Sequence, residues 1–507
     1  MRKRWLVGAL VVAGAAGAGA IAACTGDAGA TGATGSTGAN GANGINGATG
    51  PTGAGGTAGA PGSAGAGGAA GATGGTGAAG SAGAAGDGGA TIVVSTNAAQ
   101  GLAISPVPVN LAGLTSAQVE MVGEGSYLVN AVASCADCHG SVATGGFLAG
   151  GTPFGGAPAP FTVYARNLTP DPATGLVLTM DQFVSSLRTG ADYAGVSDGG
   201  TPLQQLVVMP WTVYRWMSLD DLRSVWMYLR AIPAAKNAVT ADTKTTAAPV
   251  PLPSLYDEGV LGDGGPALPP AGATDPGDVV RGLALNPLNI PAPADPAGQI
   301  AFARGAYLVN AISACNDCHT NPARTASFAI PTAAYLTGGA VFATPPPLQP
   351  VVHTVRSMSA NLLGAGGGFF NMPSVTFETF LTDITQGTHA EDPHPTPLAW
   401  PMPWPAFQHM TLSDLQAIYT YASTVAKGTH LADKPTQSAA LYCDTANACP
   451  PGTGTCNAED GGTGECVGQA CDSSHGDADC PACQSCVSSA CTLPSTGTLA
   501  ACIANGL

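Results

Sequence analysis

Residues 125–139 read GSYLVNAVASCADCH, and residues 305–319 repeat them as GAYLVNAISACNDCH. Ten of the fifteen positions are identical, so the 507-residue chain contains an internal repeat with an offset of 180 residues. Each copy ends in two cysteines three positions apart and a histidine directly after the second. The repeat predicts two similar domains, each carrying one such site.

The pentapeptide C-x-x-C-H is the attachment pattern of haem c. Two thiols at this spacing can each form a thioether bond to a haem vinyl group, and the adjoining histidine can bind the iron. For a single motif, a disulfide or a zinc pair that happens to precede a histidine is the alternative. Two motifs in one repeated frame favour two haem c groups. The predicted thioether residues are Cys135, Cys138, Cys315 and Cys318, and the predicted iron ligands are His139 and His319.

A methionine is the usual second iron ligand where the task is electron transfer, because thioether ligation raises the reduction potential. The repeat extends to Met-Pro-Trp segments that begin at Met209 and Met402. These two methionines are therefore the predicted distal ligands. His409 lies near Met402 in the sequence and could compete with it, although a lone histidine is more often structural. The other methionines considered, assigned to packing or to the surface, are Met217, Met227, Met358, Met372 and Met410.

A helix is predicted to follow each methionine. Ser218 and Thr411 each stand three residues before an aspartate, in front of apolar residues at helical spacing, so both are predicted N-caps. This last helix of each module should pack against the first. The aromatic residues expected to meet there are Tyr127 with Trp226 and Tyr307 with Tyr419.

Both modules resemble the cytochrome c fold, and their fusion is similar to dihaem c-type cytochromes and to the haem domains in cytochrome subunits of bacterial membrane-bound dehydrogenases. The stretch RNLTPDPATG at residues 166–175, followed by FVSSLRTG from Phe183, strengthens the resemblance. The second module keeps a weak echo, in Asn361, Leu362 and residues 380–387. The resemblance covers about residues 115–235 and 298–428. A third haem motif and a C-terminal membrane anchor are not found, which puts a particular dehydrogenase partner in doubt.

The expected fold is mainly α, with two cytochrome c-like helical haem domains in tandem, a disordered Gly-rich N-terminal stalk and a small disulfide-rich C-terminal module. The expected boundaries are a signal peptide at 1–24, a collagen-like stalk at 25–90, haem domains at 115–235 and 298–428, a Pro-rich linker at 236–297 and a Cys-rich tail at 443–507.

The first residues have the form of a signal peptide, with Arg2, Lys3 and Arg4 before an apolar run. The run ends in IAAC at Cys24, which resembles a lipoprotein cleavage site and implies lipid attachment to that cysteine. A plain cleaved signal or an uncleaved anchor helix is the alternative. No other segment has the roughly 20 apolar residues that span a bilayer. We expect an exported lipoprotein, periplasmic or on the cell surface, tethered to a membrane.

Glycine stands at every third position from Gly26 to Gly89, the period of a collagen triple helix. Only Pro51 and Pro61 are proline within those repeats, which is far less than collagens contain. A trimer formed through a triple helix and a flexible single-chain spacer therefore both stay open. In either case the segment predicts a spacer.

The tail is rich in cysteine and poor in large apolar residues, so it needs cross-links to fold. An even set of cysteines in an exported chain predicts disulfides, with a pairing that the sequence does not give. An iron-sulfur or zinc site at Cys480, Cys483 and Cys486 is the alternative. The disulfide candidates are Cys443, Cys449, Cys456, Cys466, Cys471, Cys480, Cys483, Cys486, Cys491 and Cys502.

The formal charge of −16 argues against a general affinity for nucleic acid or anionic lipid, and favours a basic partner. The predicted function is electron transfer between redox partner proteins, from a donor dehydrogenase or membrane reductase to an acceptor oxidase or another cytochrome. No catalytic residue is assigned, because two methionine-ligated irons leave no open site. The alternatives are a dihaem peroxidase or other oxidoreductase with one open haem, and an adhesive surface protein in which the haems are secondary.

Overall fold

The computed structural model describes residues 93–140, 146–155, 162–193, 204–243, 281–325, 329–344, 349–391, 397–434, 437, 439–458, 463–471 and 480–493. The predicted leader, its lipid-bearing Cys24, the collagen-like stalk with its trimer, and Cys502 lie outside these residues. Within them, no helix combines the length and the apolar character that crossing a membrane requires.

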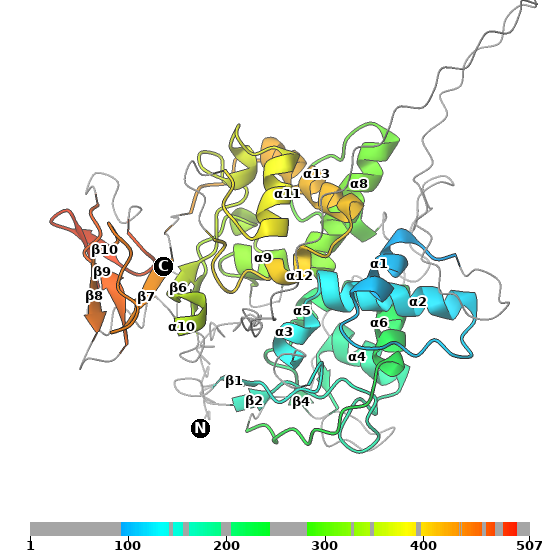
Figure 1. Cartoon of the computed structure of the whole chain (residues 1–507). Coiled ribbons are helices and arrows are strands. Elements are labelled where there is room, and N and C mark those ends of the chain that lie inside the picture. The colour runs from blue at the N-terminus through cyan, green and yellow to red at the C-terminus, as the bar shows by residue number, and fades with distance from the viewer. Residues whose placement is uncertain are drawn as a thin grey trace, which may run out of the picture.

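The first module is a set of helices with short two-stranded ribbons at its edge (Figure 1). Its helices are α1 (Thr96–Ile104), α2 (Ser116–Tyr127), the π-helical turn η1 (Leu128–Val132), α3 (Cys135–His139), α4 (Met180–Thr189), α5 (Trp211–Tyr214) and α6 (Leu219–Ala231). The antiparallel ribbons pair β1 (Pro153–Gly155) with β2 (Thr162–Tyr164), and β3 (Ala191–Asp192) with β4 (Gln204–Gln205).

The second module repeats this order and adds longer strands. Its helices are α8 (Pro296–Tyr307), η2 (Leu308–Ile312), α9 (Cys315–His319), η3 (Thr332–Ala334), α10 (Gln349–Val352), η4 (Phe369–Asn371), α11 (Phe377–Gln386), α12 (Trp404–Phe407) and α13 (Leu412–Gly428). Strands β5 (Val341–Ala343) and β6 (Thr354–Met358) pair antiparallel.

The last helix of each module packs against the first, as predicted. Helix α6 crosses α2 where Gly125 faces the carbonyl of Ser224, and a Cβ at residue 125 would come within 1.9 Å of that oxygen. Helix α13 crosses α8 in the same way, with Gly305 facing the carbonyl of Ala417 at 2.0 Å from a Cβ position. The predicted N-caps are also confirmed, since the Ser218 and Thr411 side chains accept hydrogen bonds from the third helical residues.

The packed units begin earlier than the sequence analysis placed them. Helix α1 lies on α2, with Gly101 against the carbonyl of Gly123. Residues 281–290, assigned to the linker, pack on the second module: Leu285 is buried, and Gly282 faces the Ala303 carbonyl. Because these contacts bury apolar surface, the end of the linker belongs to the second module's fold.

The two modules share one continuous hydrophobic core, which contains buried residues of both. Helix α5 of the first module contacts η2 of the second, and α12 of the second contacts η1 of the first, so both short helices lie at the centre of the molecule (Figure 1). The chain that precedes each C-x-x-C-H motif therefore touches the chain that follows the methionine of the other module.

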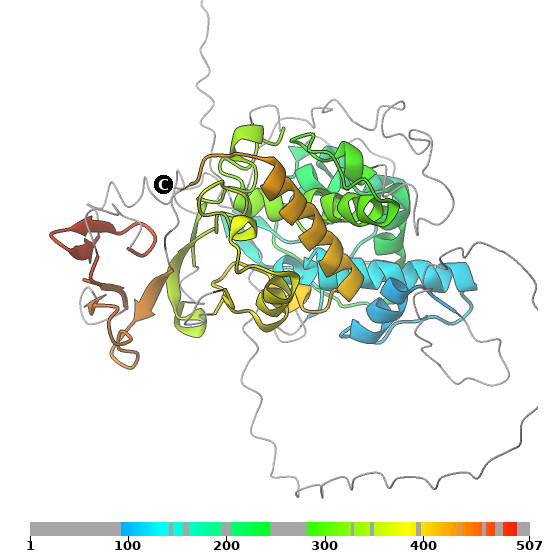
Figure 2. The same cartoon turned by 90° about the horizontal axis from the view of Figure 1, so that it is seen from above.

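The tail continues the sheet of the second module (Figures 1 and 2). Strand β7 (Ala440–Cys443) pairs antiparallel with β6, and the sheet runs in the order β5-β6-β7-β9-β8. The remaining tail strands are β8 (Thr455–Ala458), β9 (Gly464–Val467), β10 (Ser485–Val487) and β11 (Ala490–Thr492), the last two forming a hairpin.

Disulfides hold the tail together, as predicted. Four pairs join cysteines 11 to 17 residues apart: Cys443–Cys456, Cys449–Cys466, Cys471–Cys486 and Cys480–Cys491. Cys483 is disulfide-bonded as well. The alternative of a metal site at Cys480, Cys483 and Cys486 is therefore wrong for this structure, because all three sulfurs are engaged in disulfides.

Candidate haem-binding sites

Each C-x-x-C-H motif forms a one-turn helix that follows a sharp change of chain direction. The residue before the first cysteine has a left-handed backbone in both modules, with φ of 50° at Ser134 and 56° at Ala314. This residue separates the motif helix from the π-helical turn before it. As a result α3 and α9 start afresh and carry two cysteines and one histidine on a single turn.

A main-chain carbonyl orients each motif histidine. The Nδ1 atom of His139 lies 2.7 Å from the Arg166 oxygen, and that of His319 lies 2.9 Å from the Ala360 oxygen. A carbonyl only accepts hydrogen bonds, so Nδ1 carries the proton and Nε2 keeps its lone pair. Burial lowers the pKa of both imidazoles, and more strongly than the hydrogen bond to the carbonyl raises it. Both rings are therefore neutral at pH 7, with Nε2 available to bind a metal.

A repeated glycine lets that carbonyl approach the histidine. Gly150 and Gly338 each donate their backbone N–H to the motif histidine's own oxygen, both at 2.7 Å. They have φ of +76° and +75°, and a Cβ there would come within 2.6 Å of the Arg166 oxygen or 2.4 Å of the Ala360 oxygen. This element was not predicted, although its signal is present in the sequence as LAGG at residues 148–151 and LTGG at residues 336–339.

The Asn-Leu pair that the two modules share in sequence lies next to the carbonyl that contacts the histidine. Arg166 and Ala360, whose carbonyls orient the two histidines, directly precede Asn-Leu pairs at 167–168 and 361–362. Leu168 and Leu362 donate their backbone N–H groups to the oxygens of Leu148 and Leu336. These hydrogen bonds hold the segments that contain Arg166 and Ala360 beside the turns at Gly150 and Gly338.

Three of the four motif cysteines, Cys135, Cys315 and Cys318, are free thiols. Burial raises the pKa of each to about 12, so they are uncharged at pH 7. Cys138 is disulfide-bonded in this structure. A sulfur in a disulfide cannot also form a thioether, so haem attachment at this position needs a reduced Cys138.

The predicted methionine ligands border the shared hydrophobic core of the two modules. Met209 and Met402 are half-buried against the same core as Cys135 and Cys315. Met217 and Met410, another pair at matching positions, are buried in that core, in agreement with a packing role. His409, the competing ligand, is exposed at the surface.

The residues of the second module fit a haem c as they stand, and those of the first module fit one once Cys138 is reduced. Two cysteine sulfurs, a neutral imidazole with an available Nε2, and a half-buried methionine that opens the Met-Pro-Trp segment are the donor set of such a group. The carbonyl that fixes the imidazole is the outer-shell contact that metal-binding histidines usually have. The second motif also carries a buried ion pair, in which Arg324 lies 2.6 Å from Asp317.

The two sites resemble the haem sites of c-type cytochromes, and comparison with curated proteins finds the chain similar to cytochrome c subunits of dehydrogenases. It is 30% identical over 205 residues to the gluconate 2-dehydrogenase cytochrome c subunit of Pantoea cypripedii, covering 39% of this chain and 38% of that protein. It is 28% identical over 210 residues to the fructose dehydrogenase cytochrome subunit of Gluconobacter japonicus, covering 40% and 36% respectively.

A longer alignment of 239 residues relates the chain to one of the subunits of nicotinate dehydrogenase from Pseudomonas putida, at 28% identity over 46% of this chain and 17% of that protein. The chain thus spans less than two fifths of the length of these relatives. No family model matches it. At this level the similarity is to cytochrome subunits of dehydrogenases.

Proposed function

We propose that the chain is a dihaem c-type cytochrome that carries electrons and does not itself transform a substrate. The observation that carries this proposal is the repeated histidine site, in which His139 and His319 are both neutral and both fixed through Nδ1 by a main-chain carbonyl. Similarity to dehydrogenase cytochrome subunits supports the same role.

The chain's own residues would set how each site works. Met209 and Met402 would supply the second protein ligand to each iron, which would leave no open coordination site for a substrate. When bound, each haem supplies an iron that gains and loses one electron. The buried core around each motif would exclude water, and the hydrogen bonds at Arg166 and Ala360 would hold the imidazole in one orientation.

The contacts between the modules support transfer from one site to the other without domain motion. Tyr214 follows Met209 and donates a hydrogen bond to the Ala133 oxygen, two residues before Cys135. Burial raises the pKa of Tyr214, and the negative charge of Asp317 in the second motif adds to that effect. The short helix that carries Tyr214, α5, also contacts η2, which directly precedes the second motif.

We also propose that the protein is exported and anchored through lipid on Cys24, with residues 25–90 as a spacer. The leader sequence supports this part of the proposal. Incorporation of a labelled fatty acid into the wild type, and its loss in Cys24→Ser, would establish the anchor. Equal labelling of both would refute it.

The partners that we propose are redox proteins, with a dehydrogenase as donor. The relatives are subunits of gluconate, fructose and nicotinate dehydrogenases by name, which supports a dehydrogenase partner without identifying its substrate.

The decisive experiment combines haem counting with magnetic circular dichroism on the purified protein. We expect two haems per chain, thioether-linked by mass spectrometry to all four motif cysteines, and two low-spin irons with methionine-to-iron charge-transfer signals. Met209→Leu and Met402→Leu should each remove one signal, because leucine keeps the volume but cannot bind iron. The matched controls Met217→Leu and Met410→Leu should keep both signals.

A high-spin iron in the wild type would instead support the peroxidase alternative. Fewer than two haems, with Cys138 still in a disulfide, would refute the dihaem proposal.

A further inference from the structure

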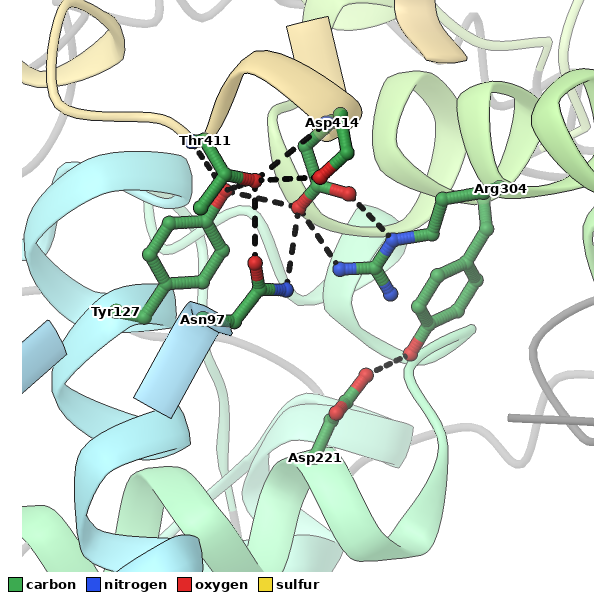
Figure 3. Close-up of polar contacts among 8 residues, drawn as sticks. Asn97, Tyr127, Asp221, Arg304, Thr411 and Asp414 are labelled. Atoms are coloured by element: carbon green, nitrogen blue, oxygen red, sulfur yellow. Dashed lines mark hydrogen bonds and ion pairs between the residues drawn. The ribbon is translucent and has the colours of Figure 1, made fainter. Parts of the chain in front are cut away.

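Two tyrosines at the same position of the internal repeat each donate a hydrogen bond to an aspartate of the other module (Figure 3). Tyr127 of the first module donates its hydroxyl to Asp414 of the second, with an O···O distance of 2.8 Å. Tyr307 of the second donates to Asp221 of the first, at 2.5 Å. Because each tyrosine ring is fully buried, the two contacts are fixed parts of the interface.

Each tyrosine hydroxyl also accepts a hydrogen bond from the N-cap residue of the other module's last helix. The Tyr127 hydroxyl accepts the backbone N–H of Thr411 at 3.0 Å, and the Tyr307 hydroxyl accepts that of Ser218 at 2.7 Å. Thr411 and Ser218 are the N-caps of α13 and α6. Removing a hydroxyl would leave a buried N–H and a buried carboxylate short of a partner, which is costly.

In both modules the N-cap bound by the tyrosine follows the predicted iron ligand by nine residues. Ser218 follows Met209, and Thr411 follows Met402. The short helix between them is held by the other module too, because α5 contacts η2 and α12 contacts η1. The methionine segment of each module is therefore held from its C-terminal side by residues of its neighbour.

We propose that Tyr127 is a positioning residue for Met402, and Tyr307 a positioning residue for Met209, so that each module sets the distal ligand of the other. This inference rests on the proposed function, in which these methionines bind iron. It predicts crossed effects: a change in the first module alters the second haem, and the reverse.

The test compares Tyr127→Phe and Tyr307→Phe in the full-length haem-loaded protein. Each haem is first assigned through Met209→Leu and Met402→Leu. Tyr127→Phe should then shift the reduction potential and the methionine charge-transfer signal of the second haem and leave the first unchanged. Tyr307→Phe should do the opposite.

Another pair of buried tyrosines provides the matched control. Tyr228 bonds to Ser105 and Asn130 within the first module, and Tyr421 bonds to Asn310 and Tyr335 within the second. Tyr228→Phe and Tyr421→Phe should therefore affect only the haem of their own module.

Amide hydrogen exchange separates positioning from simple stabilisation, since it does not depend on the haems. Loss of protection at the start of α13 in Tyr127→Phe, with both haem signals unchanged, would overturn the positioning role. So would an effect confined to the tyrosine's own module. Failure of the proposed function would be seen earlier, as absence of methionine ligation in the wild type.

Discussion

Arg356 of β6 and Glu465 of β9 form a buried ion pair with an N···O distance of 2.6 Å, and their side chains are 4% and 6% exposed. Arg356 also donates to the Ala482 oxygen, and Gln484 donates to Glu465. One arginine of the second module therefore reaches two separate parts of the disulfide-rich tail. The tail is joined to this module by main-chain pairing and by charge.

Breaking this pair from one side should destabilise the protein. Glu465→Gln leaves the Arg356 guanidinium buried without its counter-charge, which should lower the free energy of unfolding by ~3 kcal/mol or more. Denaturant unfolding measures the loss. The double variant Arg356→Met/Glu465→Leu should recover most of it, and a single variant as stable as wild type would contradict the argument.

Adding one methyl group where two helices cross should also destabilise the protein. Gly305→Ala places a Cβ 2.0 Å from the Ala417 oxygen, so α8 and α13 must separate, and we expect a loss of about 2–3 kcal/mol. Gly367→Ala is the control, because the nearest atom to its Cβ position is 4.0 Å away. Thermal unfolding should show a large fall in Tm for Gly305→Ala and a small change for Gly367→Ala.

The glycine turn beside each histidine predicts a more local effect. Gly338→Ala drives the Ala360 carbonyl away from His319, so the second module should lose low-spin haem signal or haem content. Gly339→Ala is a close control: its φ of +85° carries similar strain, but its nearest neighbour is Lys434 at 3.5 Å. Equal haem loss in both variants would contradict this prediction, because it would show that backbone strain alone causes the loss.

Glu124 predicts a pH dependence of stability. Burial raises the pKa of this carboxyl to about 8, helped by Asp221 and opposed by Arg304, with smaller contributions from Asp414 and Glu120. The unfolded chain gives up this proton near its usual pKa of 4.5, so stability should fall as the pH rises from about 4.5 to about 8. Glu124→Gln should reduce this pH dependence. At pH 8 it should raise the free energy of unfolding by ~1–3 kcal/mol, a range that allows for solvent screening of the partly exposed side chain. Unfolding curves at several pH values would test this, and an unchanged slope would count against it.

The net charge of −16 predicts that a basic redox partner associates more slowly as salt rises. Stopped-flow mixing with a basic electron acceptor at increasing ionic strength gives the rate. A rate independent of salt would rule out electrostatic steering.

Local sequence patterns predicted the elements whose cause is local. The caps at Ser218 and Thr411, the packing of the last helix on the first, and the use of the tail cysteines in disulfides are confirmed. Each depends on nearby residues or on composition. The assignment of iron ligands and the lipid anchor stay predictions.

The features that the sequence did not reveal depend on residues far apart in the chain. Tyr127 and Asp414 are 287 positions apart, and no spacing rule relates them. The carbonyls of Arg166 and Ala360 act through main-chain atoms, so the identity of the side chain carries no signal. The pairing of β7 with β6 likewise follows from tertiary packing, because the tail's composition indicates only that it needs cross-links.

The crossed tyrosine contacts give a single chain the geometry of a two-fold dimer. In a true homodimer every substitution at such an interface occurs twice, so one position cannot carry opposite charges in the two halves. Within one chain the two positions can differ: residue 304 is arginine and pairs with Asp414 at 2.9 Å, whereas its repeat equivalent, residue 124, is a glutamate whose raised pKa of about 8 keeps it largely uncharged at pH 7. Fusion of the two halves thus permits different charges beside otherwise similar sites, and under the proposed function this would give the two haems different reduction potentials.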